Sequence, residues 1–264
     1  MPLGFALGAY GTLIGAGGGF ILTPILLLLY PHESPERLTS ISLAVIFFNA
    51  LSGSGAYARM KRIDYRSGLL FSVATIPGAV LGALTTNYLP RRVFDAIFGV
   101  LLLGTCVFLL VHPNDKKECN ETSRNGVTQT IVEADGTRHV YSYNPIIGFV
   151  LSLFVGYVSS LLGIGGGIIH VPALVHLLHF PVHIATATSH FILAIMSLTG
   201  TCVHIVNGAF HQGLRRTIML SVGVVLGAQL GARLSNRVYG EWIIRGLAIA
   251  LGFVGLRILV MAFY

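Results

Sequence analysis

The sequence predicts an all-α polytopic membrane protein with about eight transmembrane helices, arranged as two repeats of four spans. Three observations support this fold class. The 264-residue chain is 54% hydrophobic and only 10% charged, with a mean hydropathy of +0.77, whereas about a quarter of the residues in a soluble domain are charged. Its apolar runs reach the ~20 residues that a helix needs to cross a bilayer. A glycine motif occurs once in each half.

The glycine motif has the form G-x-G-G-G and is followed by a proline in both copies. The first copy begins at Gly15 and leads to Pro24, and the second begins at Gly163 and leads to Pro172. Consecutive glycines interrupt a helix because they tolerate almost any backbone angle. The unpaired N–H groups of an interrupted helix are tolerated in a membrane only at a cavity or a ligand. We therefore expect the first helix of each repeat to be broken or re-entrant at its motif, which is typical of a transporter's binding site.

The first repeat is expected to cover residues 1–111. Its first span, about 3–30, would measure about 40 Å as a straight helix, beyond the ~30 Å hydrocarbon core. A break, a tilt or a re-entrant hairpin accounts for the excess length. The three further spans are expected at about residues 38–58, 68–86 and 93–111.

A polar loop, residues 112–144, is expected between the repeats. Residues 127–133 and 137–143 flank Asp135-Gly136, a common two-residue hairpin turn, so a small β-hairpin is possible there. The second repeat is then residues 145–264. Its spans are expected at about residues 145–178, 184–206, 217–234 and 242–261.

The two halves match beyond the glycine motif. Leu51-Ser52-Gly53 corresponds to Leu198-Thr199-Gly200, and Ser42 corresponds to Ser189. Glycines at four-residue spacing recur in the third span of each repeat and suit close helix packing in lipid. These glycines are Gly78 and Gly82, matched by Gly227 and Gly231.

The orientation follows from the basic residues between the spans. If each interrupted span crosses the membrane, the repeats are parallel; if it turns back, they are inverted. In either arrangement ten Lys and Arg residues lie on the side of loops 59–66 and 112–144, and five lie on the other side. Cytoplasmic loops carry the excess of positive charge. We expect both loops to be cytoplasmic, while the choice between parallel and inverted repeats stays open.

The glycine motif has two alternative interpretations. A dinucleotide fingerprint does not fit, because Phe20 and Ile168 stand where its last glycine should be and the flanks are membrane spans. Close helix packing around small residues is the structural alternative. With its flanking residues, 15–24 and 163–172, the paired motif resembles the signature of the TauE/SafE family. The resemblance covers essentially the whole chain and implies an inner-membrane permease for small anions, notably sulfite and related organosulfur compounds.

The expected binding site lies between the two glycine breaks. Helix N-termini carry unpaired N–H groups and a partial positive charge, so two facing termini can hold an anion without a buried Lys or Arg. Side chains of the following spans are expected to complete the site, although they could equally bond the neighbouring backbone. The expected substrate-binding residues are Gly17, Gly18, Gly19, Phe20, Gly165, Gly166, Gly167, Ile168, Asn49, Ser52, Ser189 and His190.

Two histidines are candidates for proton coupling. His170 lies in the second glycine motif and His190 inside the sixth span, where an ionisable group is costly and often functional. A neutral packing histidine is an equal alternative for each. A metal site at residues 176–183 is disfavoured because Pro181 interrupts the helix that would present it.

The sequence thus favours a secondary transporter for a small anion, in the inner (plasma) membrane. It indicates no enzyme, cofactor, metal or nucleic-acid partner, and the net charge of +7 is assigned to topology. No nucleotide-binding motif stands out, so an ion gradient, with protons as the suggested coupling ion, would supply the energy. A passive anion channel and a membrane-embedded metal or histidine enzyme are the alternatives. The particular anion, the transport direction and the oligomeric state stay open.

Overall fold

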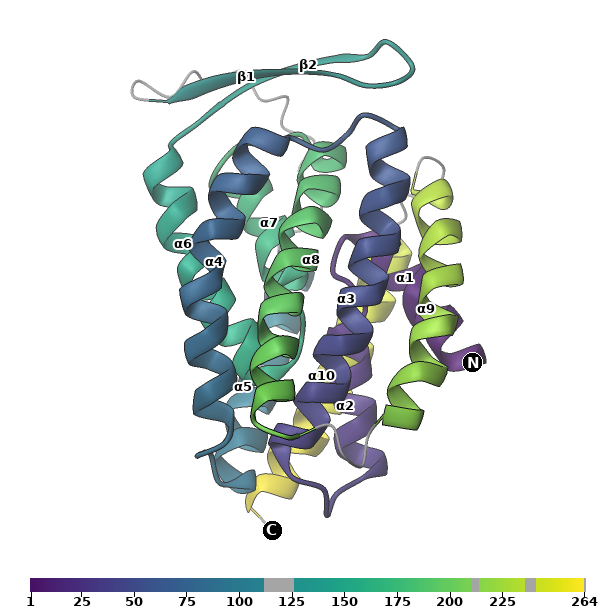
Figure 1. The fold of residues 1–264 in the computed structure, drawn as a ribbon, viewed down its shortest axis with the longest axis vertical. Coiled ribbons are helices and arrows are strands. Elements are labelled where there is room, and N and C mark those ends of the chain that lie inside the picture. The colour runs from purple at the N-terminus through teal and green to yellow at the C-terminus, as the bar shows by residue number, and fades with distance from the viewer. Residues whose placement is uncertain (112–125, 210–213, 236–240, 264) are drawn as a thin grey trace.

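The computed structural model describes residues 1–111, 126–209, 214–235 and 241–263. Along the chain, two shorter helices followed by three long ones occur twice (Figure 1). The first half contains α1 (Pro2–Ile14), α2 (Gly19–Leu29), α3 (Pro35–Arg59), α4 (Tyr65–Thr86) and α5 (Arg91–Val111). Strands β1 (Val127–Val132) and β2 (Arg138–Tyr143) follow. The second half contains α6 (Pro145–Leu162), α7 (Gly167–His176), α8 (Val182–Val206), α9 (Leu214–Leu234) and α10 (Glu241–Phe263).

Local sequence signals set the helix boundaries. The side chains of Ser34, Asp64 and Asn144 accept hydrogen bonds from backbone N–H groups in the first turns of α3, α4 and α6, as helix N-caps do. Both α1 and α6 end at a glycine in the left-handed conformation, Gly15 at φ 83° and Gly163 at φ 66°. Such a residue stops a helix at little steric cost.

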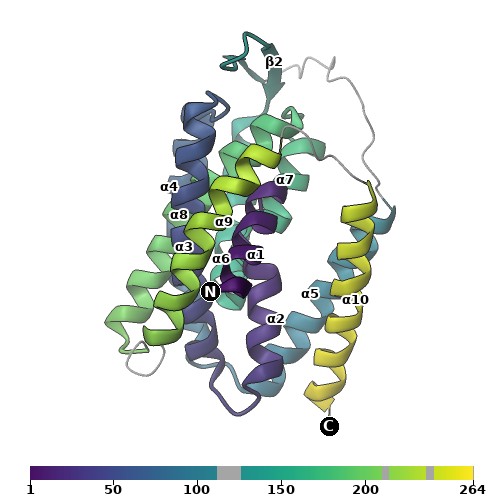
Figure 2. The ribbon, with the colours of Figure 1, turned by 90° about the vertical axis from the view of Figure 1, so that its right-hand side faces the viewer.

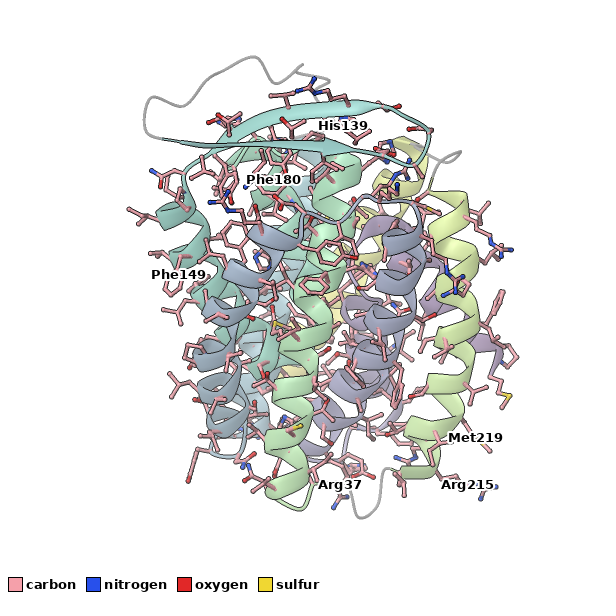
Figure 3. The ribbon with its side chains drawn as sticks, turned by 45° about the horizontal axis from the view of Figure 1, so that its top comes forward. Arg37, His139, Phe149, Phe180, Arg215 and Met219 are labelled. Carbon is pink, nitrogen blue, oxygen red and sulfur yellow. The ribbon has the colours of Figure 1, made fainter. Side chains whose placement is uncertain are left out.

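The bundle has two distinct ends. At the hairpin end, strands β1 and β2 lie over the loops that join the helices (Figure 1). At the opposite end, the guanidinium of Arg91 donates to the carbonyl of Glu33 at 2.7 Å, and Arg216 lies 4.0 Å from the ring centroid of Tyr30. Figure 3 shows Arg37 and Arg215 at this opposite end, far from His139 on the hairpin.

The pairs α1–α2 and α6–α7 turn back at their glycine motifs. Helix α6 starts directly after β2, and the residues after α7, including Phe180, pack on Tyr141 and Tyr143 of the hairpin. Both ends of this pair therefore lie at the hairpin end. Helix α1 runs toward that same end, and α2 returns to the opposite end, where the Leu27 carbonyl accepts from Arg91. The sequence left two arrangements open, and the structure has the inverted one.

Each helix pair packs against the other half of the chain. Helix α1 lies on α9, and a Cβ added to Gly227 would come within 2.1 Å of the Phe5 carbonyl oxygen. Helix α6 lies on α4, and a Cβ on Gly78 would come within 2.2 Å of the Leu153 carbonyl oxygen. The expectation that these glycines permit close helix packing is confirmed. Figure 2 shows α5 and α10 as a further pair along one side of the bundle.

The apolar helices identify a polytopic membrane protein. In the part of the chain that the structure describes, five helices are long and apolar enough to cross a membrane, namely α3, α4, α6, α8 and α9. About eight transmembrane helices were expected from the sequence. In the described ranges, the helices of 21 to 25 residues that run from one end of the bundle to the other are α3, α4, α5, α8, α9 and α10.

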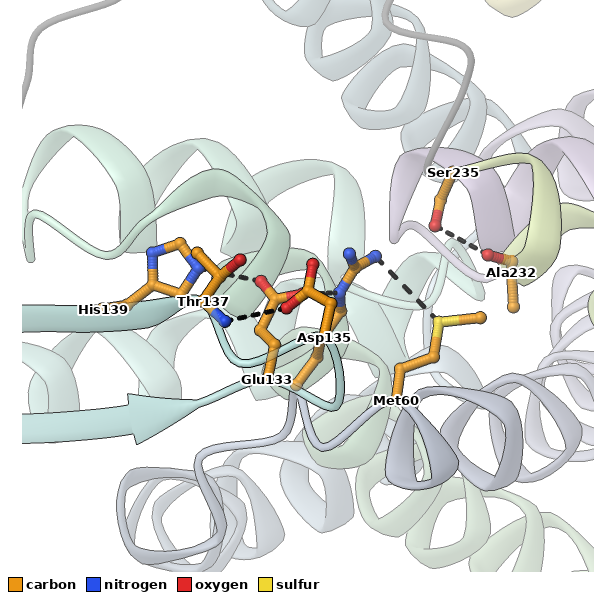
Figure 4. Close-up of polar contacts among 8 residues, drawn as sticks. Met60, Glu133, Asp135, Thr137, His139, Ala232 and Ser235 are labelled. Carbon is orange, nitrogen blue, oxygen red and sulfur yellow. Dashed lines mark hydrogen bonds and ion pairs between the residues drawn. The ribbon is translucent and has the colours of Figure 1, made fainter.

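The β-hairpin expected in the polar loop is present. Strands β1 and β2 pair antiparallel with Val127 opposite Tyr143, while residues 112–125 of that loop lie outside the described residues. Glu133 lies between two basic groups, with Oε2 2.5 Å from Arg62 Nε and Oε1 2.8 Å from His139 Nε2 (Figure 4). The Ala134 N–H also donates to the Met60 carbonyl at 3.0 Å. These contacts attach the hairpin to the loop between α3 and α4.

A buried carboxylate attaches the other end of the hairpin. The Tyr141 hydroxyl donates to Asp64 Oδ2 at 2.7 Å, and Ser67 Oγ donates to the Tyr143 hydroxyl at 2.6 Å. Burial raises the pKa of Tyr141, and the negative charge of Asp64 raises it further. The Asp64 N–H donates to Thr188 Oγ1 on α8 at 3.0 Å. The hairpin therefore covers the hairpin end of α3, α4 and α8.

Candidate functional site

The two glycine breaks lie directly against each other inside the bundle. A Cβ added to Gly19 would be 2.7 Å from the Ile164 carbonyl oxygen, and one added to Gly167 would be 2.4 Å from the Gly15 carbonyl oxygen. All residues of both motifs are buried. Gly18 at φ 76° and Gly166 at φ 60° are the N-caps of α2 and α7, in a left-handed conformation that favours glycine. The N-termini of α2 and α7 therefore meet in the interior.

Backbone donors at these two N-termini have no acceptor. Neither N-cap residue supplies a side-chain hydrogen bond to its helix. Among the residues that the structure describes, the N–H groups of Gly18, Gly19 and Phe20 at the first break, and of Gly166 and Ile168 at the second, donate no hydrogen bond. The first N–H groups of any helix lack partners within the helix, but here they are also away from the protein surface.

Two carbonyl groups at the same breaks accept hydrogen bonds from hydroxyl groups. The Gly163 carbonyl, at the end of α6, accepts from Thr23 Oγ1 at 2.6 Å and from Ser42 Oγ at 2.7 Å. The Gly15 carbonyl, at the end of α1, accepts from Ser189 Oγ at 3.4 Å. Hydroxyl groups thus bond the glycine that ends α1 and the glycine that ends α6, whereas no side chain bonds the positive ends of α2 and α7.

A buried polar cluster from three helices adjoins the first break. Thr12 Oγ1 on α1 donates to Asn49 Oδ1 on α3 at 3.1 Å, and His190 Nε2 on α8 lies 3.3 Å from the same Thr12 oxygen. The Tyr57 hydroxyl donates to the Thr12 carbonyl at 2.8 Å. A Cβ on Gly53 would be 2.6 Å from the His190 ring, so this glycine makes room for the imidazole. Asn49 and His190, both expected at the site, lie side by side here.

Two expected residues lie elsewhere. Ser52 Oγ donates to the Val225 carbonyl of α9 at 2.8 Å and accepts from Gln229 at 2.9 Å, so the structure does not bring Ser52 to the breaks. His170 Nε2 lies 3.0 Å from Ser152 Oγ, between α7 and α6. Its side chain joins the two helices of one hairpin instead of facing the other break.

The remaining expected residues are the break residues themselves. Gly17 and Gly165 have φ angles of 71° and 81°. The side chains of Phe20 and Ile168 are buried in the main apolar core. These two residues therefore offer the interior of the site only their backbone groups.

Four residues at the breaks were not identified from the sequence: Thr12, Ile46, Ser159 and Leu193. A Cβ on Gly17 would be 2.3 Å from Leu193 Cδ2, and one on Gly165 would be 3.0 Å from Ile46 Cδ1. Ile46 and Leu193 occupy matching positions of the two halves, three residues after the matching pair Leu43 and His190. The correspondence between the halves could have identified them.

Ser159 lies beside the second break. A Cβ on Gly166 would be 2.8 Å from Ser159 Oγ, and this buried oxygen has no hydrogen-bond partner among the described residues. A serine within an apolar helix commonly bonds its own backbone, so the sequence alone gave no signal that distinguished it.

The chemistry of this region is that of hydrogen bonding. In the described ranges no group of three or more His, Cys, Asp or Glu side chains is placed to hold a metal ion. Backbone N–H groups, hydroxyl groups, one amide and one imidazole face the two breaks. Such a set suits a small ligand that accepts hydrogen bonds.

Comparison with known proteins agrees with a membrane transporter. The family model described as "Sulfite exporter TauE/SafE" matches residues 1–258. The chain is 31% identical over 263 residues to a probable membrane transporter protein of Bacillus subtilis, YunE, and the match covers 97% of this chain and 95% of that protein. A probable membrane transporter protein of Methanocaldococcus jannaschii is 22% identical over 97% of this chain and 93% of its own length. No solved structure matches this chain.

Proposed function

This chain belongs to the TauE/SafE sulfite exporter family, and we propose that it is a secondary transporter for sulfite or a related organosulfur anion such as a sulfonate. Its relatives are named probable membrane transporter proteins, which supports transport over enzymatic activity. The proposed site lies between the two breaks and uses the N–H groups of residues 17–20 and 165–168. Asn49, Ser189 and His190 are proposed to complete it.

The observation that carries this proposal is the set of buried N–H groups at the N-termini of α2 and α7 that donate no hydrogen bond. The carbonyl ends of α1 and α6 receive hydroxyl hydrogen bonds from Ser189, Thr23 and Ser42, while the N–H ends of α2 and α7 lack acceptors. An anion supplies the missing acceptors, and the positive ends of two helix dipoles favour its charge. This arrangement needs no buried Lys or Arg.

The inverted arrangement of the helices supports alternating access. We assign residues 1–111 and 145–264 to two repeats that move relative to each other about the breaks, as in other transporters with inverted repeats. Residues 112–144 join them at the hairpin end. The excess of basic residues supports a cytoplasmic location for this end in a plasma (inner) membrane. A proton gradient is the proposed source of energy, with His190 as the proton-carrying group.

Flux measurements in proteoliposomes test this proposal. Purified protein is assayed with sulfite, thiosulfate, sulfoacetate, taurine and sulfate, each with and without a pH gradient. Saturable uptake of one or more of the sulfur anions, increased by the gradient, is expected. Flux that rises linearly with the anion concentration and does not depend on the pH gradient would instead identify a passive channel. An absence of flux for the whole panel would refute transport of these anions.

A further inference from the structure

Three buried polar side chains on α6 and α8 have no hydrogen-bond partner among the described residues. They are Ser160 on α6 and Thr201 and His204 on α8, here named the Ser160–His204 cluster. Ser160 and His204 are completely buried, and Thr201 is 7% exposed. Both ring nitrogens of His204 and the hydroxyl oxygens of Ser160 and Thr201 lack a partner in the described part of the chain. Buried polar groups in proteins are otherwise almost always paired.

The cluster lies between α6 and α8, toward the end opposite the hairpin. A Cβ on Gly200 would be 2.7 Å from Ser160 Oγ, so the serine side chain faces α8 at this glycine. Residues three and four apart share one face of a helix, so His204 lies one turn beyond Gly200 and Thr201 on α8. From Gly200, α8 continues toward Asn207, at the end away from β1 and β2.

Matching positions in the first half form a cluster that is only partly satisfied. Gly53 and Tyr57 correspond to Gly200 and His204, and Thr12 corresponds to Ser160. In the first half the Tyr57 hydroxyl donates to the Thr12 carbonyl, and Thr12 Oγ1 bonds Asn49. The hydroxyl of Ser54, which matches Thr201, has no partner in the described part of the chain, so the two halves differ at Thr12 and Tyr57, which are paired, and at Ser160 and His204, which are not. An apolar side chain at Ser160 or His204 would make the folded state more stable, because an unpaired buried polar group destabilises it.

The cluster begins one residue from the second break. Ser159, the neighbour of Ser160, lies beside Gly166 at the N-terminus of α7. Unpaired hydroxyl groups therefore occur at the break, on Ser159, and at the next residue of α6, on Ser160, which faces α8. Hydroxyl groups and an imidazole N–H donate hydrogen bonds, which an oxyanion accepts.

We propose that the Ser160–His204 cluster is a second station for the transported oxyanion, between the break site and the end opposite the hairpin. This proposal rests on the transport function proposed above. The anion exchanges the N–H groups of the break for the hydroxyl and imidazole donors of the cluster as it passes. Thr201 and His204 therefore act on the rate of transport, whereas binding at the break does not depend on them.

A matched pair of substitutions tests the second station with sulfite as the probe. Thr201→Val removes an unpaired hydroxyl, and Thr199→Val removes one that already donates to the Ile195 carbonyl at 2.9 Å. Sulfite flux in proteoliposomes should fall about tenfold in Thr201→Val, as for a lost hydrogen bond to a charged ligand, and stay unchanged in Thr199→Val. His204→Leu should also lower the flux, and His204→Gln, which keeps a donor, should restore part of it.

Stability and binding measurements separate this role from a structural one. His204→Leu should keep or raise the melting temperature without ligand, and it should retain thermal stabilisation by sulfite at the break. Wild-type flux in Thr201→Val and His204→Leu would overturn the second station while leaving the proposed function intact. A lower melting temperature in His204→Leu would also overturn it, because His204 would then have a partner within the fold. If the wild type itself shows neither sulfite flux nor stabilisation, the proposed function fails and the station fails with it.

Discussion

His190 Nε2 on α8 lies 3.3 Å from Thr12 Oγ1 on α1, although 178 residues separate the two positions. The same threonine hydroxyl donates to Asn49 Oδ1 on α3 at 3.1 Å. One hydroxyl group therefore joins three helices of both halves beside the first break. Removing the Thr12 hydroxyl should therefore remove a hydrogen bond from both Asn49 and His190.

Thr12→Val is expected to destabilise the protein by about 1–3 kcal/mol, because the isosteric valine leaves Asn49 Oδ1 and His190 Nε2 without their shared partner. Thr12→Ser keeps the hydroxyl and is the control. Reversible unfolding of the purified protein in detergent measures the difference. Equal stability of the valine variant and the wild type would show that these hydrogen bonds contribute nothing to the fold.

Proton coupling is expected to depend on His190 and not on His170. His190 contacts the cluster at the break, whereas His170 bonds Ser152 within one helix pair. His190→Gln should flatten the pH dependence of sulfite flux while sulfite still binds, and His170→Gln should keep the wild-type pH profile. Flux profiles from pH 5 to 8 cover the range in which an unperturbed histidine titrates. An unchanged profile in both variants would leave both histidines with packing or hydrogen-bonding roles only.

The break site is best tested at Gly166. A Cβ on Gly18 would meet the Leu7 backbone carbonyl at 2.7 Å, so Gly18→Val is expected to prevent folding. At Gly166 the new Cβ would instead meet the Ser159 side chain, which can move. The left-handed conformation adds a cost of about 1–2 kcal/mol for alanine. Gly166→Ala is therefore expected to fold and to lose thermal stabilisation by sulfite, since its methyl group lies at the unpaired N–H groups.

Gly55→Ala is the control for this substitution, because nothing lies within 4 Å of the position of its Cβ. It should keep the wild-type response to sulfite and gain about 0.5–1 kcal/mol of stability, as expected for Gly replaced by Ala in a helix. If Gly166→Ala folds and keeps full stabilisation by sulfite, the anion does not bind at the breaks and the glycines are packing residues.

The orientation of the molecule can be tested with single cysteines. In a functional variant without Cys106, Cys119 and Cys202, a cysteine replaces either Val140 on the hairpin, 52% exposed, or Arg215 at the opposite end. The excess of basic residues predicts that Val140→Cys resists an impermeant label from outside intact cells. Arg215→Cys should react readily, and the reverse pattern would overturn the orientation.

The hairpin attachment should weaken at alkaline pH. The pKa of Tyr141 is raised by burial and by Asp64, and that of Tyr143 is raised mainly by burial. Both hydroxyls stay protonated in the folded state at a pH where they ionise in the unfolded state. Their stabilising contribution is thus complete below about pH 10, the pKa of an unperturbed tyrosine, and is lost as pH rises toward the folded-state values. The melting temperature should fall above pH 10, and it should fall less in Tyr141→Phe. An equal decline in both would place the sensitivity elsewhere.

The glycine breaks, the packing glycines and the β-hairpin could all be predicted from local sequence, since each depends on the backbone freedom of particular residues. Whether a break continues or reverses the helix could not. A run such as Gly17–Gly19 is compatible with any turn angle. The basic residues divide ten to five between the two sides in both the parallel and the inverted arrangement. The reversal instead depends on contacts between distant segments, such as Gly167 with Gly15.

The sequence also could not predict which helix each side chain of the site faces. Asn49 and Ser52 lie on one turn of α3, about 60° apart around its axis, yet Asn49 faces α1 and Ser52 faces α9. Thr12 was overlooked because a lone threonine in an apolar helix carries no signal of its own. Its role follows from tertiary contacts that bring α1, α3 and α8 together.

The packing of α1 on α9 also constrains how the protein is made. The groove for α1 is lined by Gly223, Gly227 and Gly231, and the ribosome adds these residues only after more than 200 others. At about 5–20 residues per second this interval lasts on the order of 10–40 s. During that time α1 of the nascent chain has no α9 to pack against. Membrane insertion therefore has to tolerate α1 without its packing partner. A truncated chain that ends before α9 should be degraded by quality-control proteases.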